Sequence, residues 1–289
     1  MERVAPDNRE GGAAASGFPR KIRVLSDLHL GHPGCRVREV EALRPLLEDV
    51  PMLVLNGDTS EQRHSQLVER GREQLDAFRA LAERTGTRLV FLRGNHDPEA
   101  STLDRLDLAE GRVFLTHGDA LFRHLSPWSP KIWRVIPDME RLRAEYGEDR
   151  LLDDLDLALE CAHRCRAISP GYENEFKTGP LRHARTLARI AWPPRRPVNI
   201  LKTWLSVPRL AHAFAARFRP GARLFLFGHT HFPGVWREGG RLVVNTGGFL
   251  SMLPARCVDL DGEVAIVRAV RETGGRFAPG RERVRVALD

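Results

Sequence analysis

The chain has 289 residues, of which 42% are hydrophobic and 29% are charged, so it is long enough to bury a substantial core. No segment approaches the roughly 18 uninterrupted apolar residues of a membrane-spanning helix, which argues against an integral membrane protein. The formal charge of +7 favours an anionic partner, such as a phosphate ester, a nucleic acid or an anionic lipid surface.

The N-terminal residues are rich in Ala and Gly and lack the apolar core of a signal peptide. We therefore expect residues 1–20 to form a flexible, uncleaved tail. We also expect the protein to be cytoplasmic.

Short apolar segments alternate with amphipathic ones in residues 21–122. The apolar segments predict buried strands at 22–25, 52–55, 89–92 and 113–115. Apolar residues at helical spacing predict helices within 37–47 and 67–81. This alternation of strands and helices favours an α/β fold with parallel strands.

The pattern changes in residues 123–220, which show long helical patterns and no convincing strand. Strands are predicted again from residue 221 onward, at 223–227, 234–236, 241–245, 256–260 and 264–267. Glu238-Gly239-Gly240 and Asp261-Gly262 are typical hairpin turns. We therefore expect one domain made of residues 21–122 and 221–289, with residues 123–220 as a helical insertion.

Five short polar motifs follow five of the predicted strands. They are Asp27-Leu28-His29, Gly57-Asp58, Gly94-Asn95-His96-Asp97, His117-Gly118-Asp119 and Gly228-His229-Thr230-His231. Sites in open α/β sheets assemble at the carboxyl ends of strands, so motifs far apart in sequence are expected to converge. Carboxylate, imidazole and amide side chains suit borderline divalent metals such as Mn, Fe, Zn or Co. Any one motif alone is weak evidence, but all five in this order indicate a metal site.

These motifs resemble those of the calcineurin-like metallophosphoesterase family, over about residues 21–116 and 222–267. The resemblance implies a β sandwich flanked by helices and a site for two divalent metal ions. It assigns Asp27, His29 and His231 to one ion, Asn95, His117 and His229 to the other, and Asp58 to both. It also implies that His96 is a catalytic residue, as a proton donor or phosphate ligand, and that Asp97 orients it.

The activity implied by this resemblance is hydrolysis of a phosphate ester or pyrophosphate by a metal-bridging hydroxide. We expect Mn as the metal, with Fe, Zn and Co as alternatives. Because imidazoles must be deprotonated to bind a metal, we expect activity to fall at acidic pH.

The insertion interrupts the metal site in sequence, so its ends should lie near the metals and it could act as a lid. No Asp or Glu occurs between residues 176 and 237, and apolar residues from 200 to 218 form a stripe at helical spacing. The stripe fits the core of a lid, and it also fits a groove for acyl chains or a contact with a membrane surface.

A helical insertion at this position resembles the lid of the UDP-2,3-diacylglucosamine pyrophosphatases, whose corresponding block is similar to residues 117–122. This resemblance suggests a nucleotide-linked lipid as substrate and peripheral contact with the inner membrane face. That branch carries Arg where this chain has His96. The alternatives are a phosphodiesterase or nuclease for nucleotides or nucleic acid, and a non-catalytic scaffold that retains the fold.

The other histidines lack neighbouring carboxylate motifs. We expect a solvated or core position for His124, His163, His183 and His212. His32 and His64 follow the first two motifs closely, so contact with substrate and a structural role remain equally open for both.

Overall fold

The structure is a computed structural model that describes residues 18–127, 129, 132–168, 195–250 and 254–289. Most of the expected tail, residues 1–17, therefore lies outside the described residues. The strands are β1 (Lys21–Leu25), β2 (Met52–Asn56), β3 (Arg88–Leu92), β4 (Arg105–Leu108), β5 (Val113–Thr116), β6 (Leu224–Phe227), β7 (Gly234–Glu238), β8 (Arg241–Asn245), β9 (Arg256–Asp261), β10 (Val264–Thr273) and β11 (Arg276–Ala287). The helices are α1 (Val68–Thr85), α2 (Ile136–Tyr146), α3 (Glu148–Asp153), α4 (Leu155–Ile168) and α6 (Arg195–Phe218), with short 3-10 helices η2 (Val40–Leu46), η3 (Asp119–Leu121) and η4 (Ile132–Arg134).

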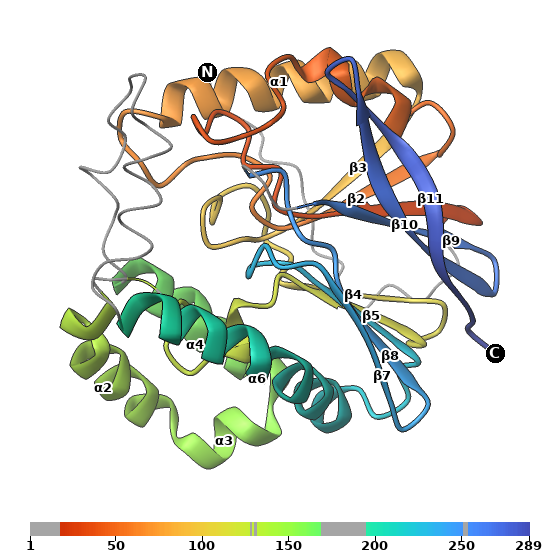
Figure 1. The fold of residues 1–289 in the computed structure, drawn as a ribbon. Coiled ribbons are helices and arrows are strands. Elements are labelled where there is room, and N and C mark those ends of the chain that lie inside the picture. The colour runs from red at the N-terminus through yellow and green to blue at the C-terminus, as the bar shows by residue number, and fades with distance from the viewer. Residues whose placement is uncertain (1–17, 128, 130–131, 169–194, 251–253) are drawn as a thin grey trace, which may run out of the picture.

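The strands form two sheets that face each other (Figure 1). One sheet has the order β11-β10-β9-β1-β2-β3, and the other has the order β4-β5-β6-β8-β7. The strands that precede the polar motifs are parallel to their neighbours, β1 with β2 and β2 with β3 in one sheet, and β5 with β6 in the other. The carboxyl ends of these strands are therefore at one end of each sheet.

The core between the sheets is built from alternate residues of each strand. Val24 and Val54 of one sheet pack with Leu115 and Leu226 of the other, and none of the four is exposed to solvent. Because side chains alternate between faces of a strand, the remaining apolar residues point to the outer faces. Both faces of each sheet therefore require an apolar cover, which explains the continuous apolar segments in the sequence.

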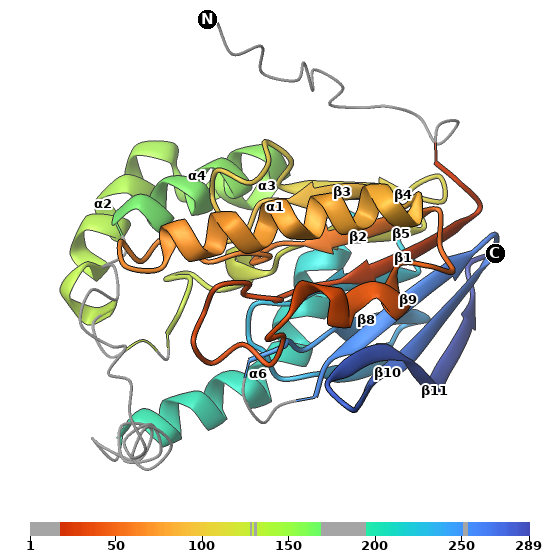
Figure 2. The same cartoon turned by 90° about the horizontal axis from the view of Figure 1, so that it is seen from above.

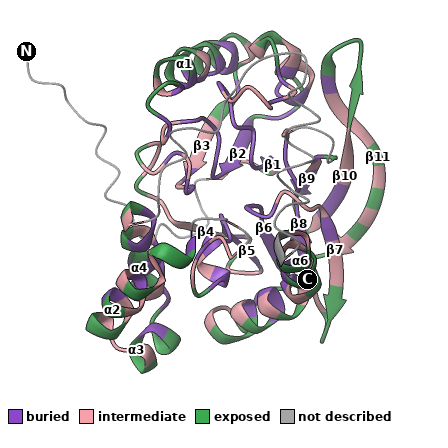
Figure 3. Ribbon diagram, turned by 60° about the vertical axis from the view of Figure 1, so that its left-hand side comes forward, coloured by how far each residue is buried: buried purple, intermediate pink, exposed green. Residues whose placement is uncertain are grey.

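Helices supply that cover on both outer faces. Phe78 and Leu81 of α1 pack with η2 on the first sheet, and Val207 and Ala211 of α6 pack on Phe225 of the second. Figure 2 shows α1 lying along β2 and β3, and Figure 3 shows that α1 and α6 each carry both buried and exposed residues. The expected α/β fold, a sandwich flanked by helices, is confirmed.

Helices α2, α3 and α4 pack around a small apolar cluster that includes Met139, Leu151, Cys161 and Cys165. No described helix is both long and apolar enough to cross a lipid bilayer. Helix α6 continues through Pro208.

Three elements differ from expectation. The expected helix within 37–47 is the short 3-10 helix η2, which contains Pro45, a residue that cannot donate a backbone hydrogen bond. Strands β4 and β11 were not predicted, because their sequences, RLDL and RFAPGRERVRVA, have charged residues and few apolar ones. Both are edge strands, which need little apolar character because one side lacks a partner strand.

Candidate metal centre

The five polar motifs lie in the loops that follow β1, β2, β3, β5 and β6. Backbone hydrogen bonds join these loops directly. The amide of His29 donates to the carbonyl of Asp58 at 2.9 Å, and the amide of Gly228 donates to the carbonyl of His117, also at 2.9 Å. The convergence expected from the positions of the motifs is therefore present in the fold.

The backbone at this site is held in an unusual conformation. Asp27, His29, Asp58, His229 and His231 all have φ between 51° and 67°, the left-handed region that non-glycine residues rarely adopt. Such a conformation costs about 1–3 kcal/mol per residue, and it persists where surrounding structure holds it in place. The clustering of this backbone conformation in the motif loops indicates that these loops are shaped to position the side chains of the motifs.

Glycines allow the loops to approach each other closely. A Cβ atom on Gly94 would lie 2.2 Å from both the amide nitrogen and a carboxylate oxygen of Asp58. A Cβ atom on Gly228 would lie 2.0 Å from a carboxylate oxygen of Asp27. Gly94 is thus required where the third motif meets the second, and Gly228 is required where the fifth motif meets the first.

Two potential metal-binding groups share Asp58. One contains Asp27, His29, Asp58 and His231, and the other contains Asp58, His117 and His229. A third group, made of His29, Glu61 and His96, shares His29 with the first. Within each group the potential ligand atoms lie within 4.8 Å of one another. Oδ1 of Asn95 lies 3.0 Å from Nε2 of His117 and so joins the second group. The fit to two divalent ions is good, because a carboxylate common to two N/O ligand sets can bridge two such ions.

All of these side chains are buried or nearly so, with His231 the most exposed at 24% of its side chain. Neighbouring groups fix their orientation. Nδ1 of His117 lies 3.1 Å from the carbonyl oxygen of Asn56, and Nε2 of His229 lies 2.9 Å from the carbonyl oxygen of Leu125. Contacts of this kind leave the second ring nitrogen of each histidine to bind a metal.

Strong electrostatic coupling accompanies this burial. Burial acts to raise the pKa of Asp58, but the charges of His117 and His96 outweigh it, so the pKa lies well below its ordinary value. Burial acts to lower the pKa of His117, but Asp58 raises it to about 10. Burial and the charge of His117 lower the pKa of His229 to about 4. The charge of Asp58 therefore favours the protonated form of His117, whereas burial favours the neutral form of His229.

Glu61 is a buried residue of the site that the sequence analysis did not single out. Its two carboxylate oxygens lie 3.0 and 3.1 Å from Nδ1 of His96, and the residue is 2% exposed. Despite burial, the charges of Glu61 and Asp58 raise the pKa of His96 to about 9. The sequence feature that could have identified Glu61 is an acidic residue three positions after Asp58 in the same loop, within Gly57-Asp58-Thr59-Ser60-Glu61.

Asp97 has a different environment from the one expected for a residue that orients His96. Its carboxylate accepts hydrogen bonds from the backbone amides of Gly94, Asp58, Thr59 and Ser60. Burial and the charge of Asp58 raise its pKa to about 7. Asp97 therefore connects the second motif to the third, and the carboxylate that contacts the His96 ring is that of Glu61.

Asp119 completes the fourth motif and connects it to helix α4. Its carboxylate is fully buried and is paired with Arg166 of α4, with one N–H···O distance of 2.8 Å. Burial acts to raise the pKa of Asp119, but Arg166 lowers it far below the ordinary value. The loop that carries His117 is thus fixed to a helix from the region expected to form an insertion.

The remaining histidines are placed as follows. His124 contacts Glu140, and His212 is buried with Nε2 4.0 Å from Glu238. His163 is half-buried on α4, and His183 lies outside the described residues. The His32 ring is 6.1 Å from that of His29, and its Nδ1 accepts a hydrogen bond from the amide of Gly34. His64 is buried just before α1.

Comparison with known proteins finds similar solved structures and a matching family. Similar solved structures include a dimetal phosphatase from Danio rerio, at 11% identity over 93% of this chain and 99% of that one, with a TM-score of 0.45. They also include Vps29 from Chaetomium thermophilum, at 12% identity over 92% of this chain and 98% of that one, with the same TM-score. A search of curated proteins finds no match.

The family assignment rests on a broader model of related sequences, because these TM-scores are low. The model, described as calcineurin-like phosphoesterase, matches residues 20–233, which is well over half of the chain. The matched range contains every one of the five polar motifs. The chain therefore belongs to the calcineurin-like phosphoesterase family.

Proposed function

We propose that this protein hydrolyses a phosphate ester or pyrophosphate with the help of two divalent metal ions. The observation that carries this proposal is the sharing of Asp58 by two groups of largely buried N/O ligands, which come from four loops, with Asn95 added from a fifth. Keeping these groups together without a bound cation would be costly, because buried carboxylates and imidazoles lose their hydration.

The proposed ligands of one ion are Asp27, His29 and His231, and those of the other are Asn95, His117 and His229, with Asp58 common to both. When bound, the two ions would supply a nucleophilic water at neutral pH and neutralise charge on the phosphoryl oxygens. The N/O ligand set suits Mn, which we propose as the metal, and also Fe, Zn or Co. The amide of Asn95 adds an oxygen ligand without adding negative charge, which favours binding of a phosphate.

The proposed role of His96 is to donate a proton to the leaving oxygen. Nδ1 of His96 lies 3.1 and 3.0 Å from the carboxylate oxygens of Glu61, whose charge favours the imidazolium form, and Nε2 is the proposed proton donor. Glu61 is a positioning residue in this scheme, because it acts through His96. Asp97 supports both by holding the backbone of the Asp58 and Asn95 loops together.

We further propose that the substrate has an apolar part, such as the acyl chains of a nucleotide-linked lipid. The indole of Trp204 on α6 stacks on Phe232, which directly follows His231, with ring centroids 4.3 Å apart. Also on α6, Val198, Leu201 and Leu205 are 48%, 55% and 72% exposed. An exposed apolar stripe on the helix whose Trp204 contacts Phe232 suits a lipid presented at the inner face of a membrane in the cytoplasm.

The formal charge of +7 also supports a second substrate class, nucleotides or nucleic acid, cleaved by the same metal site. A third proposal is a non-catalytic scaffold. The three proposals differ in which substrate, if any, the metal-loaded protein should cleave.

The test is turnover by the Mn-reconstituted protein of bis(p-nitrophenyl) phosphate, p-nitrophenyl phosphate and a UDP-linked diacyl sugar in parallel. Asp58→Asn should abolish turnover of every substrate. The matched control is Asp76→Asn, which changes an exposed carboxylate on α1 that pairs with Arg79. Preferential cleavage of the lipid diphosphate would support the proposed substrate, cleavage of the diester alone would favour nucleotides, and absence of metal-dependent turnover would favour the scaffold.

A further inference from the structure

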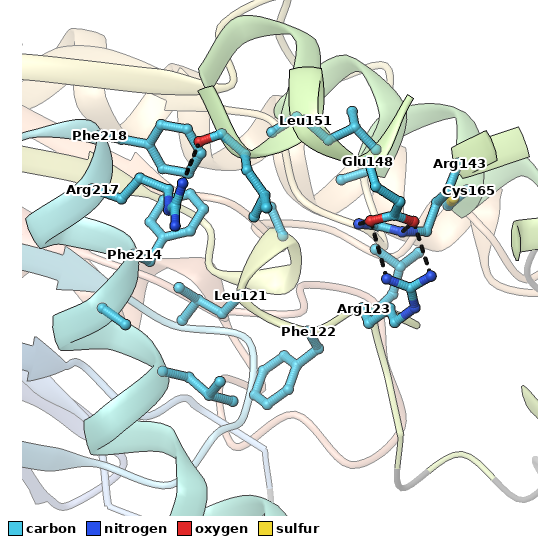
Figure 4. A pocket seen from close by; sticks show the side chains of 17 residues that line it. Leu121, Phe122, Arg123, Arg143, Glu148, Leu151, Cys165, Phe214, Arg217 and Phe218 are labelled. Atoms are coloured by element: carbon cyan, nitrogen blue, oxygen red, sulfur yellow. Dashed lines mark hydrogen bonds and ion pairs between the residues drawn. The ribbon is translucent and has the colours of Figure 1, made fainter. Parts of the chain in front are cut away.

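The two sets of proposed metal ligands differ in what lies behind them. The segment that contacts His229 lines a cavity of about 460 Å³ among η3, α3, α4 and α6 (Figure 4). Leu125 is part of this lining, and its carbonyl oxygen lies 2.9 Å from Nε2 of His229. Asp27, a proposed ligand of the other ion, is instead backed by residues 246–250, which follow β8 and are called the β8 loop below.

The β8 loop connects the first polar motif to the fifth. Strand β8 is parallel to β6, so its carboxyl end lies at the same end of the sheet as the fifth motif. Nδ2 of Asn245, the last residue of β8, donates to the carbonyl of Gly228 at 2.7 Å, and the amide of Phe249 donates to the carbonyl of Asp27 at 2.9 Å. A Cβ atom on Gly248 would lie 2.9 Å from Cβ of Asp27. The loop is thus packed directly against the metal centre, although it carries no carboxylate or imidazole of its own.

Two buried hydroxyl groups link this loop to the carboxylate of Asp27. Oγ of Ser26 donates to Oδ2 of Asp27 and lies 2.5 Å from Oγ1 of Thr246, and these two residues are 2% and 1% exposed. An ionised carboxylate only accepts hydrogen bonds and each hydroxyl has one proton, so Ser26 donates to Asp27 and accepts from Thr246. The other acceptors within reach of the two hydroxyls, the carbonyls of Gly247 and Phe227, are farther away, at 3.4 and 3.3 Å.

The two carboxylate oxygens of Asp27 have different neighbours. Oδ1 lies 3.2 Å from Nε2 of His231 and 3.9 Å from Nε2 of His29, the other two residues assigned to the same ion. Oδ2 accepts the hydrogen bond from Ser26. The amide nitrogen of His229 lies 3.1 Å from both oxygens and does not distinguish them. Of these hydrogen-bond donors, Ser26 is therefore the one that determines which oxygen faces the other ligands.

We propose that Ser26 and Thr246 are positioning residues for the first metal ion, the one assigned to Asp27, His29 and His231. They act through Asp27, because the linked hydroxyls hold Oδ2 and leave Oδ1 to bind the metal. Removing a group that orients a metal ligand typically weakens metal affinity by about 10–100-fold. This role rests on the proposed function, since it requires a metal ion at Asp27.

The first measurement is titration of the metal-free full chain with Mn, by calorimetry and electron paramagnetic resonance. The unaltered protein should bind two ions and show the signal of a coupled Mn pair. Ser26→Ala should weaken one ion by about 10–100-fold and leave the other tightly bound, so that the signal of a single Mn replaces that of the pair. Asp27→Ala gives the reference for a centre that keeps only the second ion.

Thr246 is tested by two substitutions that differ in the hydroxyl. Thr246→Val keeps the shape of the side chain, and it should weaken the same ion by less than Ser26→Ala does, because Ser26 can still donate to Asp27. Thr246→Ser retains the hydroxyl and should bind Mn as the unaltered protein does. In the double variant Ser26→Ala with Thr246→Val, the affinity should equal that of Ser26→Ala alone. Additive losses would show that Thr246 does not act through Ser26.

Thr87→Val is the matched control for removal of a buried hydroxyl. Thr87 is 5% exposed and donates to the carbonyl of Leu47 at 3.0 Å, and it lies before β3, at the amino end of that strand. This variant should lower Tm without changing either Mn affinity. A general loss of stability is thereby separated from a loss of metal affinity.

The outcomes separate this inference from the proposed function. Unchanged Mn affinities in Ser26→Ala and Thr246→Val, or equal weakening of both ions, would overturn the positioning role and leave the proposed hydrolase standing. Selective weakening of one ion, in a protein that cleaves none of the phosphate substrates, would keep the positioning role and reject the hydrolase. Failure of the unaltered protein to bind Mn would overturn both.

Discussion

The carboxylate oxygens of Glu61 lie 3.0 and 3.1 Å from Nδ1 of the His96 imidazole. Glu61 belongs to the same loop as Asp58. This pairing joins the second and third motifs by side chains as well as by backbone. It makes the protonation of His96 dependent on Glu61, which itself belongs to a potential metal-binding group with His29 and His96.

Glu61→Gln should reduce kcat, because Gln keeps the shape of the side chain but removes the charge that favours the imidazolium of His96. General acid catalysis contributes about 10²–10⁴-fold, so the loss should approach this range for substrates with a poor leaving group. The measurement is kcat and KM for aryl phosphate diesters whose leaving groups differ in pKa. The loss should shrink toward p-nitrophenolate, which needs little protonation, and an equal loss for every leaving group would contradict the assigned role. Glu69→Gln, an exposed change on α1, is the control.

Gly94→Ala should impair metal binding. The added methyl would lie 2.2 Å from the amide nitrogen and a carboxylate oxygen of Asp58, so the Asp58 loop must move away from its ligand partners. Metal content by elemental analysis after reconstitution with Mn should fall, and the increase in Tm on adding Mn should be lost. Gly221→Ala is the matched control, because a Cβ atom there meets nothing within 4 Å. Full Mn content in Gly94→Ala would show that the loop tolerates the displacement.

Arg166→Met should destabilise the fold strongly, because it leaves the carboxylate of Asp119 buried without its cationic partner. Removing one partner of a buried ion pair costs about 3–5 kcal/mol in the free energy of unfolding. Urea unfolding measures this loss. The double variant Asp119→Leu with Arg166→Met should recover part of it, since no charge is left buried, and additivity of the two single effects would refute the pairing. Arg164→Met, at an exposed position of the same helix, should change stability by less than about 0.5 kcal/mol.

Asp49→Asn should weaken the dependence of stability on pH in acid. Arg23 is 1% exposed and donates to Asp49 at 2.6 and 3.1 Å, and it also donates to Asp259. Burial acts to raise the pKa of Asp49, but its bonds to Arg23 lower it below the ordinary value. The stabilisation is therefore complete above the unfolded pKa of about 3.9, and it is lost as pH falls through the lower, folded value.

The check is urea unfolding of metal-free protein between pH 7 and the acid limit of solubility. Asp49→Asn should be less stable than the unaltered protein near neutrality, and the difference should narrow as the pH falls below about 4. A constant difference across this range would mean that the carboxylate charge of Asp49 does not contribute.

Much of the sandwich could be predicted from sequence because its strands are buried on both faces. Apolar segments such as 52–55 and 113–115 have no other stable location, and the glycine turns at 238–240 and 261–262 set the hairpins. The polar motifs could also be located, because each one directly follows such a strand. The sequence was less informative for β11, whose arginines alternate with valines at a sheet edge, and for η2, where Pro45 prevents a regular helix.

The sequence by itself determined the buried strand segments and the five polar motifs that follow them, because these depend on local patterns of apolar and polar residues, and the resemblance of the motifs pointed to the family. Only the tertiary structure decided that Glu61 contacts His96, that Arg166 lies against Asp119, and that a cavity backs the segment bonded to His229. The physical reason is that these contacts join residues 35 and 47 positions apart, or several separate helices. Such contacts are set by how whole elements pack, which no local pattern records.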